Sequence, residues 1–580
     1  EIGTEKAWQY ASELGLPKII ILNALDRENT NYEKAIAGIK ETFGNHAIPI
    51  TVPTKVGPDF NQLIDTLNKK IVTYPAPENG NFDCTDTSGE LKIQADSLLE
   101  DISECVAESD DTLLEKFFEN GSLTETEMQK GIHNALKNGT LIPIFCVSGE
   151  KNIGIAQMMD FISQYGINPL ERNIKCKKEN SEEIEIKANS PEPLAYVFKT
   201  INESRSGDIS LFRTFSGTIK PGLTLYNSAK SNIERIGQIF VVNGKNRTQV
   251  DELSAGDIGG VAKLKNTHTN NTLCSTNSKV TIEPIQYPYS SINIGVRPKA
   301  KGDEEKMSIG LSAIREEDPT FVFKMDPELH QMIISGQGEL HIDICAAKLK
   351  RKFNLEIDMF QPKIPYRETI KGNGDSKYRH KKQSGGAGQF AEVWMRIEPQ
   401  KADSEIEFTQ SLSGQNVDRV FVPSVEKGVK TACEMGGLAG YKVVGVKVDF
   451  YDGKQHPVDS KDIAFQIAGK HAFKEAFLSA KPCLLEPILN VSIKVPDEFM
   501  GDVMGSISSR RGKILGMDAD GSFQVIKAQV PQAEMYRYAT SLRSLTGGRG
   551  LHTESFSHYN EMPHELEQKV VQEHTEEKEG

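Results

Sequence analysis

Two polar turns, each at the end of a buried apolar run, carry side chains suited to binding a ligand. Asn23-Ala24-Leu25-Asp26 follows the apolar run 19–22, and Ser148-Gly149 follows the apolar run 141–147. Such runs predict buried strands, and in parallel α/β units ligands gather at the carboxyl ends of strands. Asn23, Asp26, Ser148 and Gly149 are therefore candidate binding residues. Alternatively, Asn23 and Asp26 only cap the next helix, as these residue types often do.

A basic cluster and a histidine-bearing loop could meet nucleic acid. Residues 377–382 read Lys-Tyr-Arg-His-Lys-Lys and run into the glycine-rich stretch 384–388. Basic side chains neutralise phosphates and glycines allow close backbone approach, although such a run alone is most often a solvated face. His456 stands in the loop 451–460, where a lone histidine is usually just exposed. Four arginines in glycine-bearing turns are either ordinary surface residues or phosphate contacts: Arg510, Arg511, Arg543 and Arg549.

Composition excludes several protein classes. The formal net charge is −13, and no apolar run approaches the roughly 18 residues of a membrane span. Eight scattered cysteines without a Cys-x-x-Cys argue against a zinc site or disulfide framework, and for a reducing cytosol. The first residues resemble no secretory signal and include no initiating Met, so we expect a fragment or trimmed chain.

The phosphate-binding signature of a nucleotide hydrolase is absent from the sequence. No Gly-x-x-x-x-Gly-Lys-[Ser/Thr] occurs, so we expect no loop that cradles phosphates and no hydroxyl that holds Mg²⁺. Asp257-Ile258-Gly259-Gly260 fits a short magnesium-loop pattern, but a structural turn explains it better. We expect no catalytic residue and no metal ligand in this chain, which should not hydrolyse a nucleoside triphosphate.

The spacing of apolar residues and turns predicts a multidomain α/β and β protein, long enough for about four or five domains. Short alternating runs separated by Gly and Asn turns are typical of an antiparallel barrel. Two segments read strand, helix, strand, strand, helix, strand, which predicts ferredoxin-like α+β domains. The expected units are an α/β domain at 1–180 with an insertion at about 46–140, a linker at 175–190, a β-barrel at 190–284, ferredoxin-like domains at 289–365 and 487–562, a mixed α+β domain at 366–486, and a charged tail at 563–580.

Several longer motifs stand in order along the chain. They are Gly336-Gln337-Gly338-Glu339-Leu340-His341-Ile342-Asp343-Ile344, the stretch 380–390, Gly501-Asp502-Val503-Met504-Gly505, Arg510-Arg511-Gly512 and the stretch 538–550. Together they resemble bacterial elongation factor G, a family of translational GTPases. The resemblance implies a ribosomal translocase built from a partial P-loop GTPase domain, a β-barrel, two ferredoxin-like domains and an elongated fourth domain that enters the decoding region.

For the first two turns, the resemblance implies a guanine site of the Asn-Lys-x-Asp type. Asp26 would accept two hydrogen bonds from the guanine edge, a charge-assisted contact that rejects adenine, while Asn23 would brace neighbouring loops. Ala24 replaces the lysine, which would cost on the order of 1–3 kcal/mol, or roughly tenfold to a hundredfold in affinity. Gly149 would still offer a backbone N–H to the base oxygen beside Ser148. We therefore expect GTP to bind weakly or not at all, and Mg²⁺ only in a full-length protein.

The resemblance also assigns a ribosome-facing end. His456 and Gln455 match a tip loop that meets the tRNA–mRNA duplex, and Gln415 and Asn416 stand in its companion loop, where Asp418 departs from the family pattern. The residues expected to face ribosomal RNA are Lys381, Lys382, Arg510, Arg511, Arg543 and Arg549. We expect a cytoplasmic, monomeric elongation factor. The alternative is a divergent paralogue with weak or no GTP hydrolysis that acts as a ribosome-binding, recycling or protection factor.

Overall fold

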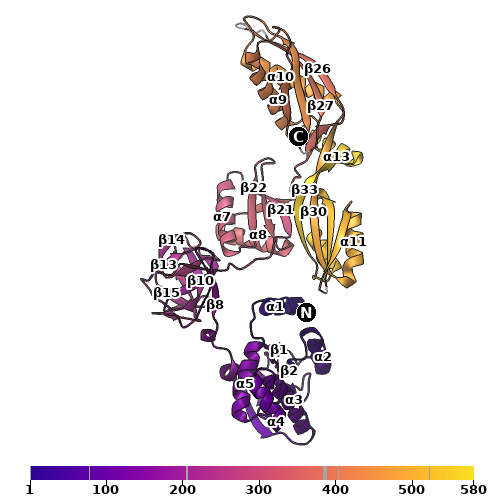
Figure 1. Ribbon diagram of the computed structural model, residues 1–580. Helices are drawn as coiled ribbons and strands as arrows, with labels where there is room; N and C mark the ends of the chain where they lie inside the picture. The colour runs from indigo at the N-terminus through magenta and orange to yellow at the C-terminus, as the bar shows by residue number, and fades with distance from the viewer. Residues whose placement is uncertain are drawn as a thin grey trace.

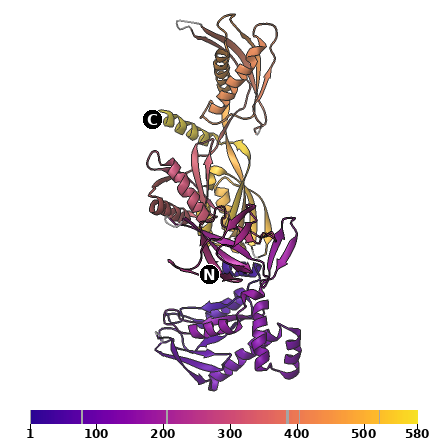
Figure 2. The same ribbon diagram turned by 90° about the vertical axis from the view of Figure 1, so that its left-hand side faces the viewer.

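The chain folds into a row of domains. The computed structural model describes residues 2–76, 79–203, 207–382, 388–402, 404–521 and 523–579. Figures 1 and 2 show an elongated molecule with an N-terminal α/β domain at one end and a fourth domain at the other. The barrel, third and fifth domains lie between them. Within the described residues, no helix is both long enough and apolar enough to cross a bilayer.

The N-terminal α/β domain is organised around a parallel sheet of order β1-β7-β2. Helix α2 begins where Asn31 accepts a hydrogen bond from the Lys34 N–H, and it ends at Gly44, whose positive φ stops the helix. The elements that surround and form the sheet are α1 (Ile2–Glu13), β1 (Ile20–Leu22), α2 (Tyr32–Phe43), β2 (Ala47–Pro49), β7 (Ile142–Cys146), α6 (Ile155–Tyr165) and the short helix η2 (Pro169–Glu171).

Between β2 and β7 the chain forms a four-stranded antiparallel sheet followed by three helices. The helices cover the parallel sheet, because Ile102 of α3 and Ile132 of α5 share one core with Phe145 of β7 and Phe161 of α6. Strand β2, which the sequence analysis places inside the insertion, belongs to the parallel sheet. The added elements are β3 (Thr51–Pro53), β4 (Gln62–Asp65), β5 (Lys70–Ala76), β6 (Asn81–Asp86), α3 (Gly89–Ala107), α4 (Asp111–Asn120) and α5 (Glu125–Asn138).

The barrel domain contains an antiparallel sheet of order β14-β13-β19-β10-β11-β18-β15-β16 and a separate pair, β12-β17, around one core. Its strands are β10 (Leu194–Glu203), β11 (Gly207–Ser216), β12 (Thr218–Ile219), β13 (Thr224–Asn227), β14 (Asn232–Arg235), β15 (Ile239–Asn243), β16 (Asn246–Gln249), β17 (Leu253–Ser254), β18 (Ile258–Ala262) and β19 (Thr272–Cys274).

The linker expected at 175–190 is wrong. Strands β8 (Ile174–Lys178) and β9 (Glu183–Ile186) pair with each other and with β20 (Val280–Ile282). Their charged residues face outward, while Cys176 is buried opposite Ile184. This charged, turn-rich segment forms a β-hairpin because burial of one apolar face stabilises it.

The third and fifth domains are both ferredoxin-like, as the repeated strand–helix pattern predicts. Their sheet orders are β22-β23-β21-β24 and β33-β30-β32-β31. The two orders are equivalent when the second is read from its other end. The third domain contains β21 (Ile292–Pro298), α7 (Glu304–Glu317), β22 (Val322–Asp326), β23 (Gln331–Gly336), α8 (Glu339–Phe353) and β24 (Ile357–Phe360). The fifth contains β30 (Pro482–Pro496), η4 (Asp497–Phe499), α11 (Met500–Ser509), β31 (Lys513–Asp520), β32 (Phe523–Pro531), η5 (Gln532–Met535), α12 (Tyr538–Leu545) and β33 (Leu551–Glu561).

The fourth domain packs two helices on a sheet of order β26-β27-β29-β28. The helices approach closely: a Cβ placed on Gly428 of α9 would lie 2.2 Å from the Gln466 carbonyl oxygen of α10. The elements are β26 (Gly374–Lys382), β27 (Gln389–Pro399), β28 (Glu407–Gln410), η3 (Arg419–Phe421), α9 (Val422–Met435), β29 (Val446–Lys454) and α10 (Asp462–Ser479). Strand β25 (Arg367–Ile370) precedes them but pairs with β30.

The charged tail expected at 563–580 is a helix. Helix α13 (His564–Glu579) lies where the fourth and fifth domains join (Figure 1). Leu566, Val570 and Val571 pack into a small core at that joint. These three apolar residues recur at helical spacing within a mostly charged stretch. They form one narrow apolar stripe, and the helix packs against the joint through it.

Candidate functional site

The two polar turns that the sequence singles out come together at the carboxyl ends of β1 and β7. Asn23 Oδ1 accepts one hydrogen bond from the Ala24 N–H at 2.7 Å and another from the Gly149 N–H at 3.0 Å. Strands β1 and β7 are parallel neighbours, with Leu22 opposite Cys146, which places both turns at one edge. Asn23 therefore braces the second turn, as the resemblance implies.

Asp26 is the best-placed acceptor at this edge. Leu25 is buried beside it, and its carbonyl oxygen accepts a hydrogen bond from the Gly57 N–H at 2.8 Å. This anchor fixes the backbone on which Asp26 stands. The Asp26 side chain is half-exposed, and among the described residues it has neither a hydrogen-bond donor nor an ion-pair partner. A carboxylate in that state can accept a pair of N–H groups from a planar base.

The other two predicted residues have different surroundings from those expected. Ser148 is fully buried, and its Oγ accepts the Lys151 N–H at 3.1 Å, so it shapes the turn. The Gly149 N–H, expected to reach a base oxygen, is already donated to Asn23. A base oxygen would have to share that N–H or displace Asn23, because one N–H has a single proton.

Ala24 is held at φ +63°, and only a methyl group stands where the family pattern has a lysine. The neighbouring Lys151 does not replace it, because its ammonium donates to the Pro58 carbonyl oxygen at 2.9 Å. The 57–58 segment was not singled out from the sequence, since no motif marks it. Asp26 thus offers a carboxylate acceptor at this edge, its binding of a guanine base stays a prediction, and the sequence contains no Gly-x-x-x-x-Gly-Lys-[Ser/Thr] loop for phosphates.

The described part of the chain contains no candidate metal centre, at this edge or elsewhere. Within those residues, no three His, Cys, Asp or Glu side chains are grouped so that they could hold an ion. Burial instead raises the pKa of the Cys146 thiol to about 12, so this cysteine under the sheet edge stays a neutral thiol.

The second predicted site is a tip on the fourth domain, where two loops are tied together. The Asp418 N–H donates to Gln455 Oε1 at 2.8 Å, and Asn416 Nδ2 donates to Asp452 Oδ1 at 3.2 Å. The Asp418 carboxylate accepts the Val420 N–H and caps η3. Gln415 is exposed, with no side-chain partner among the described residues.

His456 is oriented by its own loop. Its Nδ1 accepts the N–H groups of Val458 and Asp459 at 3.3 and 3.2 Å. In the neutral ring this assigns the proton to Nε2, for which the described residues supply no partner. Ser460 Oγ accepts the His456 N–H and donates to the Phe390 carbonyl oxygen, which ties the loop to β27. The half-exposed imidazole, whose Nδ1 also lies 3.5 Å from the Asp459 carboxylate, is therefore held in place at the tip.

Lys381 and Lys382 end β26 beside this tip. Both are exposed, and within the described residues neither has an anionic partner. The inner members of the cluster are engaged with β27, because Arg379 pairs with Glu392 at 2.6 Å and Lys377 lies 4.1 Å from the Trp394 ring centre. Gln383, Ser384, Gly385, Gly386 and Ala387 of the glycine-rich stretch lie outside the described residues.

The four fifth-domain arginines do not form one free basic face. Arg511 is paired with Glu486 and Glu534, and Arg510 bonds the Glu534 carbonyl oxygen and Ser541 Oγ. Arg543 donates to the Gln337 carbonyl oxygen of the third domain. Arg549 lies 3.5 Å from Glu498 and 3.7 Å from Glu5 of α1. Their contact with RNA stays a prediction, and Arg511 has all three nitrogens engaged.

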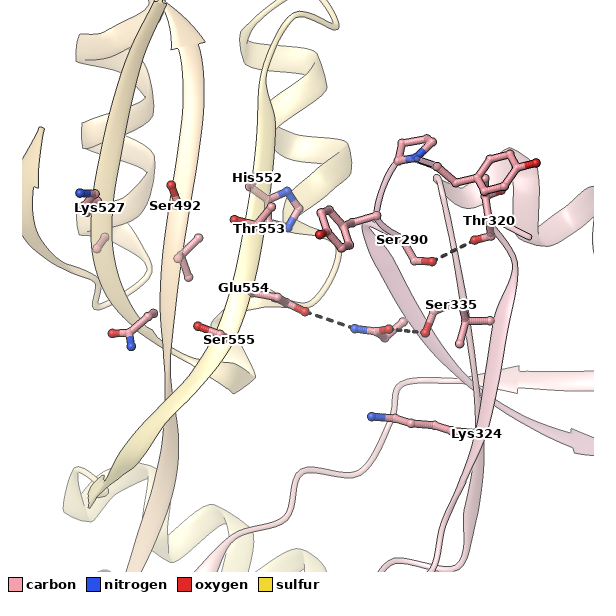
Figure 3. A pocket seen from close by; sticks show the side chains of 18 of the residues that line it. Ser290, Thr320, Lys324, Ser335, Ser492, Lys527, His552, Thr553, Glu554 and Ser555 are labelled. Atoms are coloured by element: carbon pink, nitrogen blue, oxygen red, sulfur yellow. Dashed lines mark hydrogen bonds between the residues drawn. The ribbon is translucent and has the colours of Figure 1, made fainter. Parts of the chain in front are cut away.

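A further cleft lies between the sheets of the third and fifth domains (Figure 3). Its volume is about 920 Å³. Glu554 of β33 accepts a hydrogen bond from Asn293 Nδ2 of β21 at 3.3 Å across the cleft, and Asn293 in turn accepts from Ser335. Burial raises the pKa of Glu554, against the opposing effects of Asn293 and Lys324. Burial and the Arg543 charge lower the pKa of His552 to about 4.

Comparison with known proteins gives one consistent result. Family models match four consecutive stretches: elongation factor G domain 2 over residues 192–276, domain III over 287–361, domain IV over 362–481, and the elongation factor G C-terminus over 483–570. A crystal structure from Thermus thermophilus is 33% identical with a TM-score of 0.80, covering 99% of this chain and 84% of that chain.

Proposed function

This chain belongs to the elongation factor G family and is therefore a translation-factor-like protein, and we propose that it binds the ribosome and promotes tRNA–mRNA translocation. In the full-length protein this action is coupled to GTP. We place the protein in the cytoplasm, acting as a monomer.

One observation carries the proposal: the tip of the fourth domain is built as a rigid contact surface. The Gln455 side chain joins the two tip loops, and the His456 ring is fixed with its Nε2 unpartnered among the described residues. Lys381 and Lys382 add positive charge at the end of the adjoining strand. A fixed imidazole donor beside two ammonium groups suits a phosphate-lined duplex.

A second function, ribosome binding without GTP turnover, is favoured by the guanine edge. Ala24 supplies no ammonium, and the Gly149 N–H is already donated to Asn23. Either feature weakens guanine binding. The rival protein would be a recycling or protection factor that uses the same tip without a nucleotide cycle.

Translocation on programmed ribosomes separates the two functions. The full-length protein is mixed with pre-translocation ribosomes that carry a fluorophore near the 3′ end of the mRNA, with GTP, with a non-hydrolysable analogue, or without nucleotide. Faster mRNA movement that depends on GTP supports the first function. Co-sedimentation with ribosomes without faster movement supports the second, and no co-sedimentation overturns both. Phosphate release, measured in parallel, reports whether any acceleration is coupled to hydrolysis.

A further inference from the structure

Helix α13 closes the joint between the fourth and fifth domains from outside (Figures 1 and 2). Its apolar stripe lies on a small core that mixes residues of several segments. That core comprises Ala439, Leu484 and Met562, with Tyr366, Leu438, Tyr441, Leu566, Val570 and Val571 packed against it. The loop 436–441 comes from the fourth domain and Leu484 from the first residues of β30, so the helix contacts both sides of the joint.

Polar contacts fix the position of α13. Glu567 of the helix accepts the Leu484 N–H at 2.9 Å, which ties α13 to the beginning of β30. On the other side, Gly440 stands with φ +78°, and a Cβ there would lie 2.5 Å from the His574 ring. The His574 ring of the helix thus lies against the loop, and the positive φ at Gly440 favours glycine there.

Beneath the helix, Glu368 of β25 binds the same loop. Its fully buried carboxylate accepts the N–H groups of Gly437, Leu438, Ala439 and Tyr441 at 2.6, 2.9, 2.7 and 3.1 Å. Four charge-assisted hydrogen bonds to one side chain hold the loop in a single conformation. Strand β25 pairs with β30 of the fifth domain and bridges to Val443 of the fourth, so Glu368 belongs to both.

The joint lies at the base of a long lever. Strand β26 begins at Gly374, packed against the end of α10, and runs for 9 residues to Lys382 at the tip. Nine residues of extended chain span about 30 Å, so a rotation of roughly 10° at the joint would move the tip by about 5 Å. A displacement of that size exceeds the length of a hydrogen bond, so the stiffness of the joint determines how precisely the tip is positioned.

We propose that α13 is a brace that fixes the angle between the fourth and fifth domains, and that Glu368 is the positioning residue through which the brace holds the tip. The use of this rigid arm on the ribosome rests on the function proposed above. The brace itself is a property of the free protein and can be measured without ribosomes.

The test is the distribution of distances between spin labels on the two domains. Labels are placed at Val458→Cys on the tip and Met517→Cys on β31, both at exposed positions, in a background where the exposed Cys84 is replaced by Ser. Val570→Asp puts a charge into the apolar stripe of α13. Gln572→Asp puts the same charge on its exposed face and is the matched control. Glu368→Gln keeps the side-chain volume while removing part of the acceptor capacity.

We expect a narrow distribution for the parent protein and for Gln572→Asp, and one at least twice as wide for Val570→Asp and Glu368→Gln. Truncation of the chain after Met562 should widen the distance distribution as much as Val570→Asp does. A second label pair within the fourth domain, at Val458→Cys and Met435→Cys, should stay narrow in every variant. Equal widths for truncated and parent chains overturn the brace. Equal widening of both label pairs also overturns it, since α13 would then stabilise the fourth domain rather than orient it.

Ribosome assays on the same variants keep the two proposals apart. If the distribution widens but the parent protein does not accelerate mRNA movement, the brace stands and the translocation function fails. If the parent accelerates movement while the truncated chain keeps both a narrow distribution and full activity, the brace fails and the function stands.

Discussion

The guanidinium of Arg511 holds the Glu486 carboxylate in a two-point ion pair, with nitrogen–oxygen distances of 2.7 and 2.9 Å. The Glu486 side chain is only 4% exposed, so Arg511 is the cation that offsets the burial of this carboxylate. Hydrogen bonding to Glu486 raises the pKa of Arg511, against the opposing effect of burial. Because Glu486 lies on β30 near the domain joint, Arg511 holds the fifth domain together.

Arg511→Ala should therefore loosen β30. A buried carboxylate without its partner costs about 3 kcal/mol, which we expect as a fall in the free energy of local opening. Hydrogen exchange of the amides of β30 measures that opening directly, and it avoids treating a multidomain protein as one cooperative unit. The exposed Lys513→Ala at the start of β31 is the control and should leave those amides unchanged.

A double-mutant cycle separates the ion pair from the loss of packing. Glu486→Gln removes the buried charge. In that background Arg511→Ala should lower the free energy of local opening much less than it does in the parent protein. If Arg511→Ala lowered the free energy of local opening equally in both backgrounds, the ion pair would contribute nothing to stability. Arg511 would then remain a candidate for RNA contact.

Asp26→Ala should remove the guanine preference of the N-terminal α/β domain. Losing two charge-assisted hydrogen bonds costs on the order of 1–3 kcal/mol, so affinity for a fluorescent guanine nucleotide should fall roughly tenfold to a hundredfold. Fluorescence titration measures this, with an adenine nucleotide for comparison. The exposed Glu28→Ala nearby should bind like the parent, and unchanged binding by Asp26→Ala would exclude Asp26 from the site.

Ala24→Lys, at the same edge of the sheet, should strengthen guanine binding rather than weaken it. Lysine and alanine bear comparable strain at φ +63°, so the substitution adds a side chain without a new backbone cost. Its stem can cover the base, and we expect tighter guanine binding in the same titration. If affinity does not rise, the commitment of the Gly149 N–H to Asn23 limits binding, and Asn23→Ala should then change it.

Sequence patterns predict the elements here better than they predict the partners of charged side chains. Asn31 and Gly44 mark the ends of α2, and the repeated strand–helix pattern identifies both ferredoxin-like domains. The 174–186 hairpin and α13 were missed because each buries only one narrow face, which leaves the composition charged. Arg511 shows the same limit for sites, since its motif says nothing about a buried Glu486 about 25 positions away.

Acid should weaken the fifth domain through His552. The folded state holds the His552 pKa at about 4, below its ordinary value of 6.5, because burial disfavours the charged ring. Stability from this group is thus complete above about pH 6.5 and is lost as the pH falls towards 4. The loss should be on the order of 2 kcal/mol, after a discount for the partial exposure of the ring.

The measurement is the melting temperature of the parent and of His552→Gln between pH 4 and 7. The parent should lose stability faster than the variant on the acid side, and the two curves should run parallel above about pH 6.5. The exposed His564→Gln is the control, and it should track the parent throughout. Parallel curves for His552→Gln and the parent over the whole range would remove His552 as the cause.

His456→Ala tests the tip most directly. The ring is held by its own loop through Nδ1, so its loss removes the Nε2–H while the Gln455–Asp418 hydrogen bond between the loops persists. We expect mRNA movement to slow by roughly tenfold or more, the equivalent of one charge-assisted contact, with ribosome binding nearly unchanged. Val458→Ala alters an exposed neighbour without a polar role and should move mRNA at the parent rate. A large loss of ribosome binding in His456→Ala would instead place His456 in the docking surface, and the duplex would then have to be met by Lys381, Lys382 or Gln415.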